Sequence, residues 1–356
     1  MATTPSFIKK SWNSILVKRQ TFVKNFIQNA WAKKGAFFYL VLIPLSWLFA
    51  CLTALRRWAY RVGVLKSYAL PVPVIVVGNI NVGGSGKTPA VIWLANQLKQ
   101  QGYKPAVISR GYGGDATQAT SVTPASLTSI VGDEPVLIAS RCACPVWVGA
   151  DRVDAATALL KAHPECNVIL SDDGLQHYRL KRNFEIAIAD NASLQTACLL
   201  PAGPLREAPW RLKTVDAVVC NGEPCNSENA IENAYLMQLV GEQFYNLADK
   251  HLSATAADFK HKKVTAIAGI GKPERFFEHL RKLGLSFASI GFADHYAYSA
   301  QDLAHIDSDA IIMTEKDAVK CKLFARKNFW VLPVQASIDA ALMPVILSKL
   351  AKSKEL

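Results

Sequence analysis

The stretch from Val72 to Thr88, VPVIVVGNINVGGSGKT, places a glycine-rich turn with a lysine directly after a β-branched apolar segment. Residues 74–77 are all Val or Ile, which predicts a buried parallel strand. From Pro89 the sequence AVIWLANQLKQQG carries apolar residues at helical spacing, which predicts a helix. Strand, glycine turn and helix in this order are the context of a phosphate-binding loop and restrict the chain to an α/β fold.

Small residues in this turn let backbone N–H groups approach a phosphate, and the helix that follows adds partial positive charge. We expect Lys87 to reach the outer phosphates of a nucleotide and the Thr88 hydroxyl to bind Mg²⁺. The full pattern has a glycine five positions before Gly86, where this chain has Asn81. A tight turn without a ligand is the alternative. The expected nucleotide-binding residues are Asn81, Val82, Gly83, Gly84, Ser85, Gly86, Lys87 and Thr88.

Strand and helix patterns alternate along the rest of the chain, which predicts a mostly parallel sheet with ligands at the carboxyl ends of its strands. Apolar segments at 104–109, 145–148, 168–171 and 185–189 are the further strands of the first unit. A second, smaller α/β unit begins near Lys263, where GIGKP is expected to be a strand-to-helix turn because Pro273 replaces the Ser or Thr of a phosphate loop. The alternating residues 234–243 predict a β ribbon that serves as a hinge.

We therefore expect four parts. They are membrane-associated helices at 1–66, a P-loop NTPase-like kinase domain at 67–233, a β-ribbon linker at 234–261 and a smaller α/β domain at 262–356. The eight cysteines show no CxxC pair and no zinc-type spacing, so most are expected to be small core residues in a reducing compartment.

The formal charge of +12 is concentrated at the N-terminus. The first 66 residues hold 11 Lys or Arg and no Asp or Glu, whereas the other 290 hold 29 basic and 28 acidic residues. A nucleic-acid groove should be basic, so the nearly neutral body argues against a nucleic-acid-dependent ATPase. Residues 7–31 have the spacing of a basic amphipathic helix, which is typical of an anionic membrane surface; a charged helix packed on the body is the alternative.

The run from Gly35 to Leu55 contains no charged residue and is just long enough to cross a bilayer. A secretory signal is disfavoured, because Arg56 and Arg57 follow the run instead of a small-residue cleavage site. A span would put seven Lys or Arg outside, against the positive-inside bias. We favour a segment embedded in one leaflet, with its basic flanks on anionic headgroups, over a true span.

Two pairs of adjacent acids are candidates for metal and proton chemistry. Asp172 and Asp173 follow an apolar strand, where the Mg²⁺-binding carboxylate of a P-loop enzyme belongs, and Asp172 is the first choice. Asp133 and Glu134 open a predicted helix. Acids are stabilised there by the helix dipole alone, so capping and a role at the metal or the acceptor hydroxyl both remain open.

Histidines and arginines at strand ends are further candidates. His177 and His295 stand beside acids, and each is either a catalytic group or an ordinary surface or core residue. Arg110, Arg152 and Arg206 fall in glycine-rich turns, where guanidinium groups suit phosphate oxygens or serve as structural ion-pair partners.

Taken together, these turns resemble the tetraacyldisaccharide 4'-kinase family, the lipid A 4'-kinases of Gram-negative bacteria. The resemblance covers most of the chain and rests on an ordered set of segments: PLSWLFACLTALRR, PVIVVGNINVGGSGKTP, VISRGYGG, VGDEP, GADR, DDGLQHYRL, LLPAGPLREAP, GIGKPERFF, FADHYAY and MTEKDAVKC.

The resemblance implies ATP- and Mg²⁺-dependent phosphorylation of the 4'-hydroxyl of a tetraacyldisaccharide 1-phosphate at the cytoplasmic face of the inner membrane. It implies Asp133 as the catalytic base and His295, from the second lobe, as its partner, so the two should meet when the lobes close. No obligate protein partner is expected. The implied metal positions are Thr88, Glu134 and Asp172, and the implied nucleotide or substrate contacts are Arg110, Tyr112, Arg152, Asp173, Arg206 and Glu207.

A membrane-attached P-loop GTPase or targeting ATPase is the main rival. Such GTPases usually carry an N-K-x-D guanine motif, and the closest string, residues 314–317 (TEKD), has its lysine in the wrong place.

Overall fold

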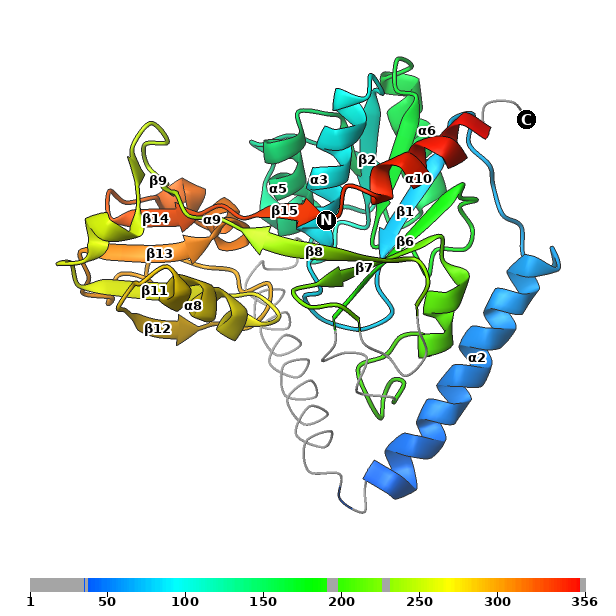
Figure 1. Cartoon of the computed structure of the whole chain (residues 1–356), viewed down its shortest axis with the longest axis horizontal. Coiled ribbons are helices and arrows are strands. Elements are labelled where there is room, and N and C mark those ends of the chain that lie inside the picture. Colours follow the sequence, from blue (N-terminus) through cyan, green and yellow to red (C-terminus); the bar gives the residue numbers. More distant parts are fainter. Residues whose placement is uncertain (1–34, 36–37, 191–197, 226–230, 353–356) are drawn as a thin grey trace, which may run out of the picture.

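The computed structural model describes residues 35, 38–190, 198–225 and 231–352, which form two α/β lobes (Figure 1). The larger lobe holds a nine-stranded sheet and the smaller lobe a six-stranded sheet. This confirms the expected fold class, a mostly parallel P-loop-type domain with a second, smaller α/β unit. The amphipathic segment expected at 7–31 lies outside the described residues.

The nine-stranded sheet has the order β15-β8-β7-β6-β1-β5-β2-β4-β3. All neighbours pair in parallel except β3 with β4 and β8 with β15. Strand β1 lies between β5 and β6, so the turn after β1 leaves from the middle of the sheet, where parallel α/β sheets bind ligands. The strands are β1 (Val74–Gly78), β2 (Pro105–Ser109), β3 (Thr120–Val122), β4 (Val146–Val148), β5 (Val168–Asp172), β6 (Phe184–Ala189), β7 (Ala217–Asn221), β8 (Ala234–Val240) and β15 (Gln335–Ile338).

Both faces of this sheet are covered, which explains why its central strands are continuously apolar. Ile75 and Val77 of β1 face a core that includes Leu94 and Ile346, whereas Val74 and Val76 face the opposite core. The covering helices and turns are α3 (Lys87–Gln100), α4 (Thr128–Val131), α5 (Asp133–Cys142), α6 (Arg152–Ala162), η2 (Pro209–Thr214) and α10 (Leu342–Lys352).

The six-stranded sheet has the order β10-β9-β14-β13-β11-β12. GIGKP forms the expected strand-to-helix turn, between β11 and α8. The elements are β9 (Phe244–Asn246), β10 (Ser253–Ala254), η3 (Ala256–Phe259), β11 (Val264–Ala268), α8 (Pro273–Lys282), β12 (Ala288–Gly291), β13 (Ala310–Thr314), α9 (Glu315–Cys321), η4 (Lys322–Phe324) and β14 (Phe329–Leu332).

Two antiparallel strands connect the lobes. The chain leaves the larger lobe along β8 and returns along β15, with Val240 opposite Gln335 and Met237 opposite Ile338 (Figure 1). The range 234–243, where a ribbon was expected, contains the single strand β8, which pairs with the distant β15 and is also a parallel neighbour of β7 in the larger sheet. The expected range 262–356 likewise does not follow the sheets, because β15 and α10 pack on the larger lobe. No local sequence pattern indicates that the chain returns to the larger lobe after it has formed the smaller one.

The apolar run forms η1 (Phe38–Leu42) and α2 (Ile43–Arg61), which stands along the outside of the larger lobe (Figure 1). Residues 40–61 are long and apolar enough to cross a membrane by length and composition. The Ser46 hydroxyl donates to the Leu199 carbonyl at 2.9 Å, and Arg57 donates to the Thr214 hydroxyl at 3.2 Å. The helix therefore contacts the lobe near both of its ends.

The cysteine expectation is wrong for one pair. Cys220 and Cys225 form a disulfide across the end of β7. A spacing of five residues does not predict this pairing. The other six cysteines are free, three of them buried.

Candidate active site

The turn between β1 and α3 is held from both sides by amide side chains. The Asn79 amide donates to the Ser85 hydroxyl at 3.0 Å, and the Asn221 amide, at the end of β7, donates to the Ser85 carbonyl at 2.9 Å. Gly86 has φ 94°, and an added Cβ would lie 2.7 Å from the Asn221 amide nitrogen, so only glycine fits there. The result is a fixed, glycine-lined helix N-terminus, which is a favourable anion site.

Two of the expected loop residues face other partners. The Val82 amide donates to the Pro204 carbonyl at 2.7 Å, so it is occupied by the protein itself. Asn81 forms an isolated bridge with Leu205. The part of the turn available to a phosphate is therefore the segment from Gly83 onward.

Cations converge on Asp173, directly beside the turn. The Lys87 ammonium lies 3.5 Å from its carboxylate, and Arg206 donates to both carboxylate oxygens at 3.1 Å. Arg152, which is buried, donates to the Asp173 backbone carbonyl at 3.4 Å. Burial opposes ionisation of Asp173, but Lys87 and Arg206 outweigh it and hold its pKa below the usual range. Lys87, Arg206 and Arg152 therefore place positive charge beside the turn, as the phosphates of a nucleotide require. The Asp173 carboxylate balances part of this charge.

Asp172 ends β5 and is fully buried. Its Oδ2 accepts from the Ser109 hydroxyl at 3.0 Å, whereas its Oδ1 has no hydrogen-bond partner among the described residues. Burial, together with the charges of Glu134 and Asp173, raises the pKa of Asp172 to about 7. A buried carboxylate oxygen without a donor fits a divalent cation, which would restore the ionised form.

No group of three or more His, Cys, Asp or Glu that could hold a metal occurs within the described ranges. Mg²⁺ usually takes only one or two carboxylates, together with phosphate oxygens and water. The residues around Asp172 therefore fit that ion in a nucleotide complex and do not form a separate metal site.

Asp133, the first residue of α5, meets His295 of the smaller lobe. The His295 Nδ1 lies 3.0 Å from each carboxylate oxygen of Asp133, and the Tyr112 ring packs edge-on against the imidazole at 5.0 Å. Asp133 also accepts from the Glu134 amide at 2.8 Å, so the helix-terminus role is present as well. Burial opposes ionisation, but the His295 hydrogen bond, Lys316 and Lys320 lower the pKa of Asp133 below its ordinary value.

Lys316 completes this cluster and was not among the predicted site residues. Its ammonium lies 2.9 Å from the Glu134 carboxylate, 3.3 Å from His295 Nε2 and 3.4 Å from Asp294. Burial opposes its charge, but Glu134, Asp133 and Asp294 raise its pKa. The segment MTEKDAVKC at the end of β13 carries it; the sequence pattern marked this segment as part of the family resemblance and as a failed guanine motif, but assigned its lysine no role.

The two lobes touch at the phosphate turn itself. A Cβ added to Gly271, in the turn after β11, would lie 2.7 Å from the Gly84 amide nitrogen. Lys272 and Arg275 pair with the buried Asp190 of the larger lobe at 2.5 and 2.9 Å. The structure is thus a closed arrangement in which the smaller lobe covers the turn.

The other predicted residues differ in how they are placed relative to the site. Arg110 is exposed at the end of β2. Glu207 belongs to a structural network, because it accepts from Gln176 and Tyr178 at 2.7 Å and lies 3.3 Å from Arg211. His177 accepts from the Arg152 amide at 3.4 Å, and burial with the Arg152 charge lowers its pKa to about 4.

Comparison with known proteins agrees with this arrangement. The family model described as Tetraacyldisaccharide-1-P 4'-kinase matches residues 38–351. A tetraacyldisaccharide 4'-kinase of Methylobacillus flagellatus is 50% identical over 317 residues, which cover 89% of this chain and 93% of the relative. That of Janthinobacterium sp. (strain Marseille) is 48% identical over 338 residues, 92% and 96% of the two chains.

A solved structure is similar over nearly its whole length. The crystal structure of LpxK from Aquifex aeolicus in complex with ATP superimposes with a TM-score of 0.75 at 29% identity, covering 86% of this chain and 98% of that chain. With the family model matched over most of its residues and relatives near half identity along almost their full length, the chain belongs to the tetraacyldisaccharide 4'-kinase family.

Proposed function

We propose that this chain transfers the γ-phosphoryl group of ATP to the 4'-hydroxyl of a tetraacyldisaccharide 1-phosphate, a precursor of lipid A. The observation that carries the proposal is the Asp133–His295 pair, which joins the two lobes at 3.0 Å on the side of the sheet where the phosphate turn lies. A switch GTPase has no need of such a pair, whereas transfer to a sugar hydroxyl does.

The segment from Gly83 to Thr88 is proposed to hold the ATP phosphates with its backbone amides. In the nucleotide complex Lys87 moves from Asp173 to the outer phosphates, while Arg206 keeps Asp173 paired. The 3.5 Å separation of Lys87 from Asp173 supports this exchange, since the ion pair is loose and a phosphate offers more negative charge. Arg152 then stabilises the Asp173 backbone from the other side.

Thr88, Asp172 and Glu134 are proposed as the residues that would hold Mg²⁺ in the nucleotide complex. When bound, the ion neutralises charge that develops on the phosphate oxygens during transfer. The raised pKa of Asp172 supports this assignment, because its burial beside Glu134 and Asp173 leaves a carboxylate that a cation would stabilise. Glu134 keeps the Lys316 ammonium within 2.9 Å, so it links the metal position to the catalytic pair.

Asp133 is proposed to accept the proton of the 4'-hydroxyl. As the hydroxyl oxygen bonds to the γ-phosphorus, the bond from that phosphorus to the ADP oxygen breaks and the proton passes to Asp133. The lowered pKa of Asp133 keeps it ionised and ready for that proton at neutral pH. His295 orients the carboxylate, and Lys316 holds His295 and Glu134 in place.

We also propose that the chain is attached to the cytoplasmic face of the inner membrane as a monotopic protein. A helix that crossed the bilayer could not pack on a body outside it along its length, whereas α2 contacts the larger lobe at Ser46 and again at Arg57. Its outward side is apolar, with four leucines about half exposed: Leu45, Leu48, Leu52 and Leu55. An acceptor with four acyl chains resides in that same membrane.

The test is the lipid product. The purified chain is incubated with ATP, Mg²⁺ and tetraacyldisaccharide 1-phosphate, and the lipids are analysed by mass spectrometry. We expect a product heavier by one phosphoryl group, made only when the acceptor is present. Steady release of inorganic phosphate without acceptor, and no phosphorylated lipid, would instead support a nucleotide-hydrolysing switch protein and contradict the proposed kinase activity.

A further inference from the structure

A large groove opens on the larger lobe, at the edge of the sheet opposite the phosphate turn. Its volume is about 920 Å³. Asn183 and Glu185, at the start of β6, line it, whereas the phosphate turn follows the end of β1. Because β1 and β6 are parallel, the length of β1 separates the two places, roughly 13 Å at strand rise. The groove is therefore not part of the phosphoryl-transfer site.

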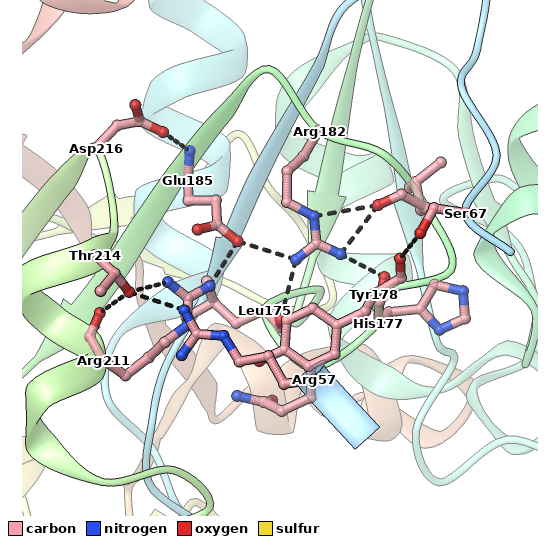
Figure 2. A network of polar contacts seen from close by, with 12 residues as sticks. Arg57, Ser67, Leu175, His177, Tyr178, Arg182, Glu185, Arg211, Thr214 and Asp216 are labelled. Atoms are coloured by element: carbon pink, nitrogen blue, oxygen red, sulfur yellow. Dashed lines mark hydrogen bonds and ion pairs between the residues drawn. The ribbon is translucent and has the colours of Figure 1, made fainter. Parts of the chain in front are cut away.

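The groove is strongly basic. Seven of its lining residues are Lys or Arg and only two are Asp or Glu. Both acids are already engaged. Glu185 accepts from Arg182 at 3.0 Å and from Arg211 at 2.6 Å (Figure 2), and Asp216 pairs with Lys349 at 3.3 Å. The remaining positive charge comes from α2, the segment before β6 and the end of α10, through Arg57, Arg61, Lys181 and Lys352.

Arg57 lines the groove and leaves part of its hydrogen-bonding capacity unused. Its guanidinium lies 4.7 Å from the Trp210 ring, and its Nη2 donates to Thr214, but its Nη1 is buried without a hydrogen-bond partner among the described residues. A buried guanidinium N–H without an acceptor is unfavourable, and a bound anion would remove the penalty. Arg61 and Lys181 are exposed at the groove and have no ion pair within the described part of the chain.

We infer that this groove binds the phosphate headgroup of an anionic phospholipid in the membrane to which the enzyme is attached. The outward leucines of α2 end at Leu55, and Arg57 and Arg61, which follow within the next two turns, line the groove. A lipid whose acyl chains lie along that apolar side therefore has its phosphate at the groove, at the depth of the headgroups. The inference rests on the proposed membrane attachment and adds a specific lipid site to it.

The experiment compares two double charge reversals at the same end of α2. Arg61→Glu with Lys181→Glu changes the groove, whereas Arg56→Glu with Lys66→Glu changes exposed residues that do not line it. Binding of the full chain is measured by co-sedimentation with phosphatidylcholine vesicles and with vesicles that also contain phosphatidylglycerol. Both variants lose the same number of positive charges near the surface, but only the groove variant loses cations that would contact a bound headgroup, so we expect it to bind the anionic vesicles about tenfold more weakly than the control variant.

A photoreactive phosphatidylglycerol then locates the lipid on the wild-type chain. We expect labelled peptides from 178–185 and from the end of α10, and we expect inorganic phosphate not to compete. Equal binding of the two variants, or labels confined to the outward side of α2, would overturn the proposal that the groove binds the lipid headgroup. Competition by inorganic phosphate would contradict a lipid ligand and indicate that the groove binds a free anion. If the wild-type chain binds neither kind of vesicle, the membrane attachment itself fails, which is a different result.

Discussion

Replacing Gly271 by alanine tests whether activity requires the closed arrangement of the two lobes. The new Cβ would lie 2.7 Å from the Gly84 amide nitrogen and 3.4 Å from its Cα, and both neighbours are backbone atoms that cannot rotate away. Ordinary van der Waals contact begins near 3.4 Å. The turn must therefore move away from the phosphate loop by about 0.7 Å.

That displacement is large on the scale of the catalytic pair. A rigid shift of the smaller lobe along the line between the lobes would lengthen the His295 to Asp133 distance from 3.0 Å to about 3.7 Å, beyond hydrogen-bond range. Misplacements approaching 1 Å can reduce a rate by up to about 100-fold, so we expect Gly271→Ala to lower kcat by roughly 10- to 100-fold.

The assay is phosphoryl transfer from labelled ATP to the lipid acceptor in detergent micelles, with ATP affinity measured separately by calorimetry. Gly291→Ala, also in the smaller lobe, is the control, because its Cβ would meet only Pro273 at 3.9 Å. We expect kcat to fall for Gly271→Ala alone while ATP affinity changes little. A kcat equal to that of Gly291→Ala would refute the argument, and a loss confined to ATP affinity would show that the clash disturbs the phosphate loop and not lobe closure.

Three other predictions use different parts of the structure. Lys87→Met should weaken ATP binding by about tenfold or more in calorimetry and leave the melting temperature nearly unchanged, because Arg206 keeps Asp173 paired; unaltered affinity would remove Lys87 from the nucleotide site. His177 has a pKa lowered to about 4 by burial, so between pH 6.5 and 4 the unfolded chain binds a proton that the folded chain does not, and stability falls as pH falls. His177→Gln should reduce that slope in urea titrations, and an identical slope would contradict the burial argument. A chain without residues 1–66 lacks α2 and should no longer sediment with anionic vesicles while still binding ATP; full retention would contradict the membrane anchor.

The phosphate turn was predictable because its signals are local. Four β-branched residues, a glycine turn and a helical pattern follow one another, and the structure forms β1, the turn and α3 there. The helix begins at Lys87, two residues before the expected Pro89, since Gly86 in the left-handed region already starts it.

The links across the lobes were harder to predict from residue patterns. Asp133 and His295 are 162 positions apart, and only the family resemblance paired them. No role was predicted for Lys316 or for the turn at Gly271. The role of a lysine at the start of a helix, or of a glycine after a strand, depends on the residues that pack against it, and the local sequence does not show these. The return of β15 to the larger sheet depends on pairing with β8, which no local pattern encodes.

The central claim is that Asp133, held by His295 across the closed lobes, accepts the proton of the sugar hydroxyl. The most direct measurement is kcat for Asp133→Asn with saturating ATP and lipid acceptor, since asparagine keeps the shape of the side chain and removes its basicity. We predict a fall of roughly 10²- to 10⁴-fold with little change in ATP affinity. A kcat equal to that of the unaltered chain would contradict this account of the site.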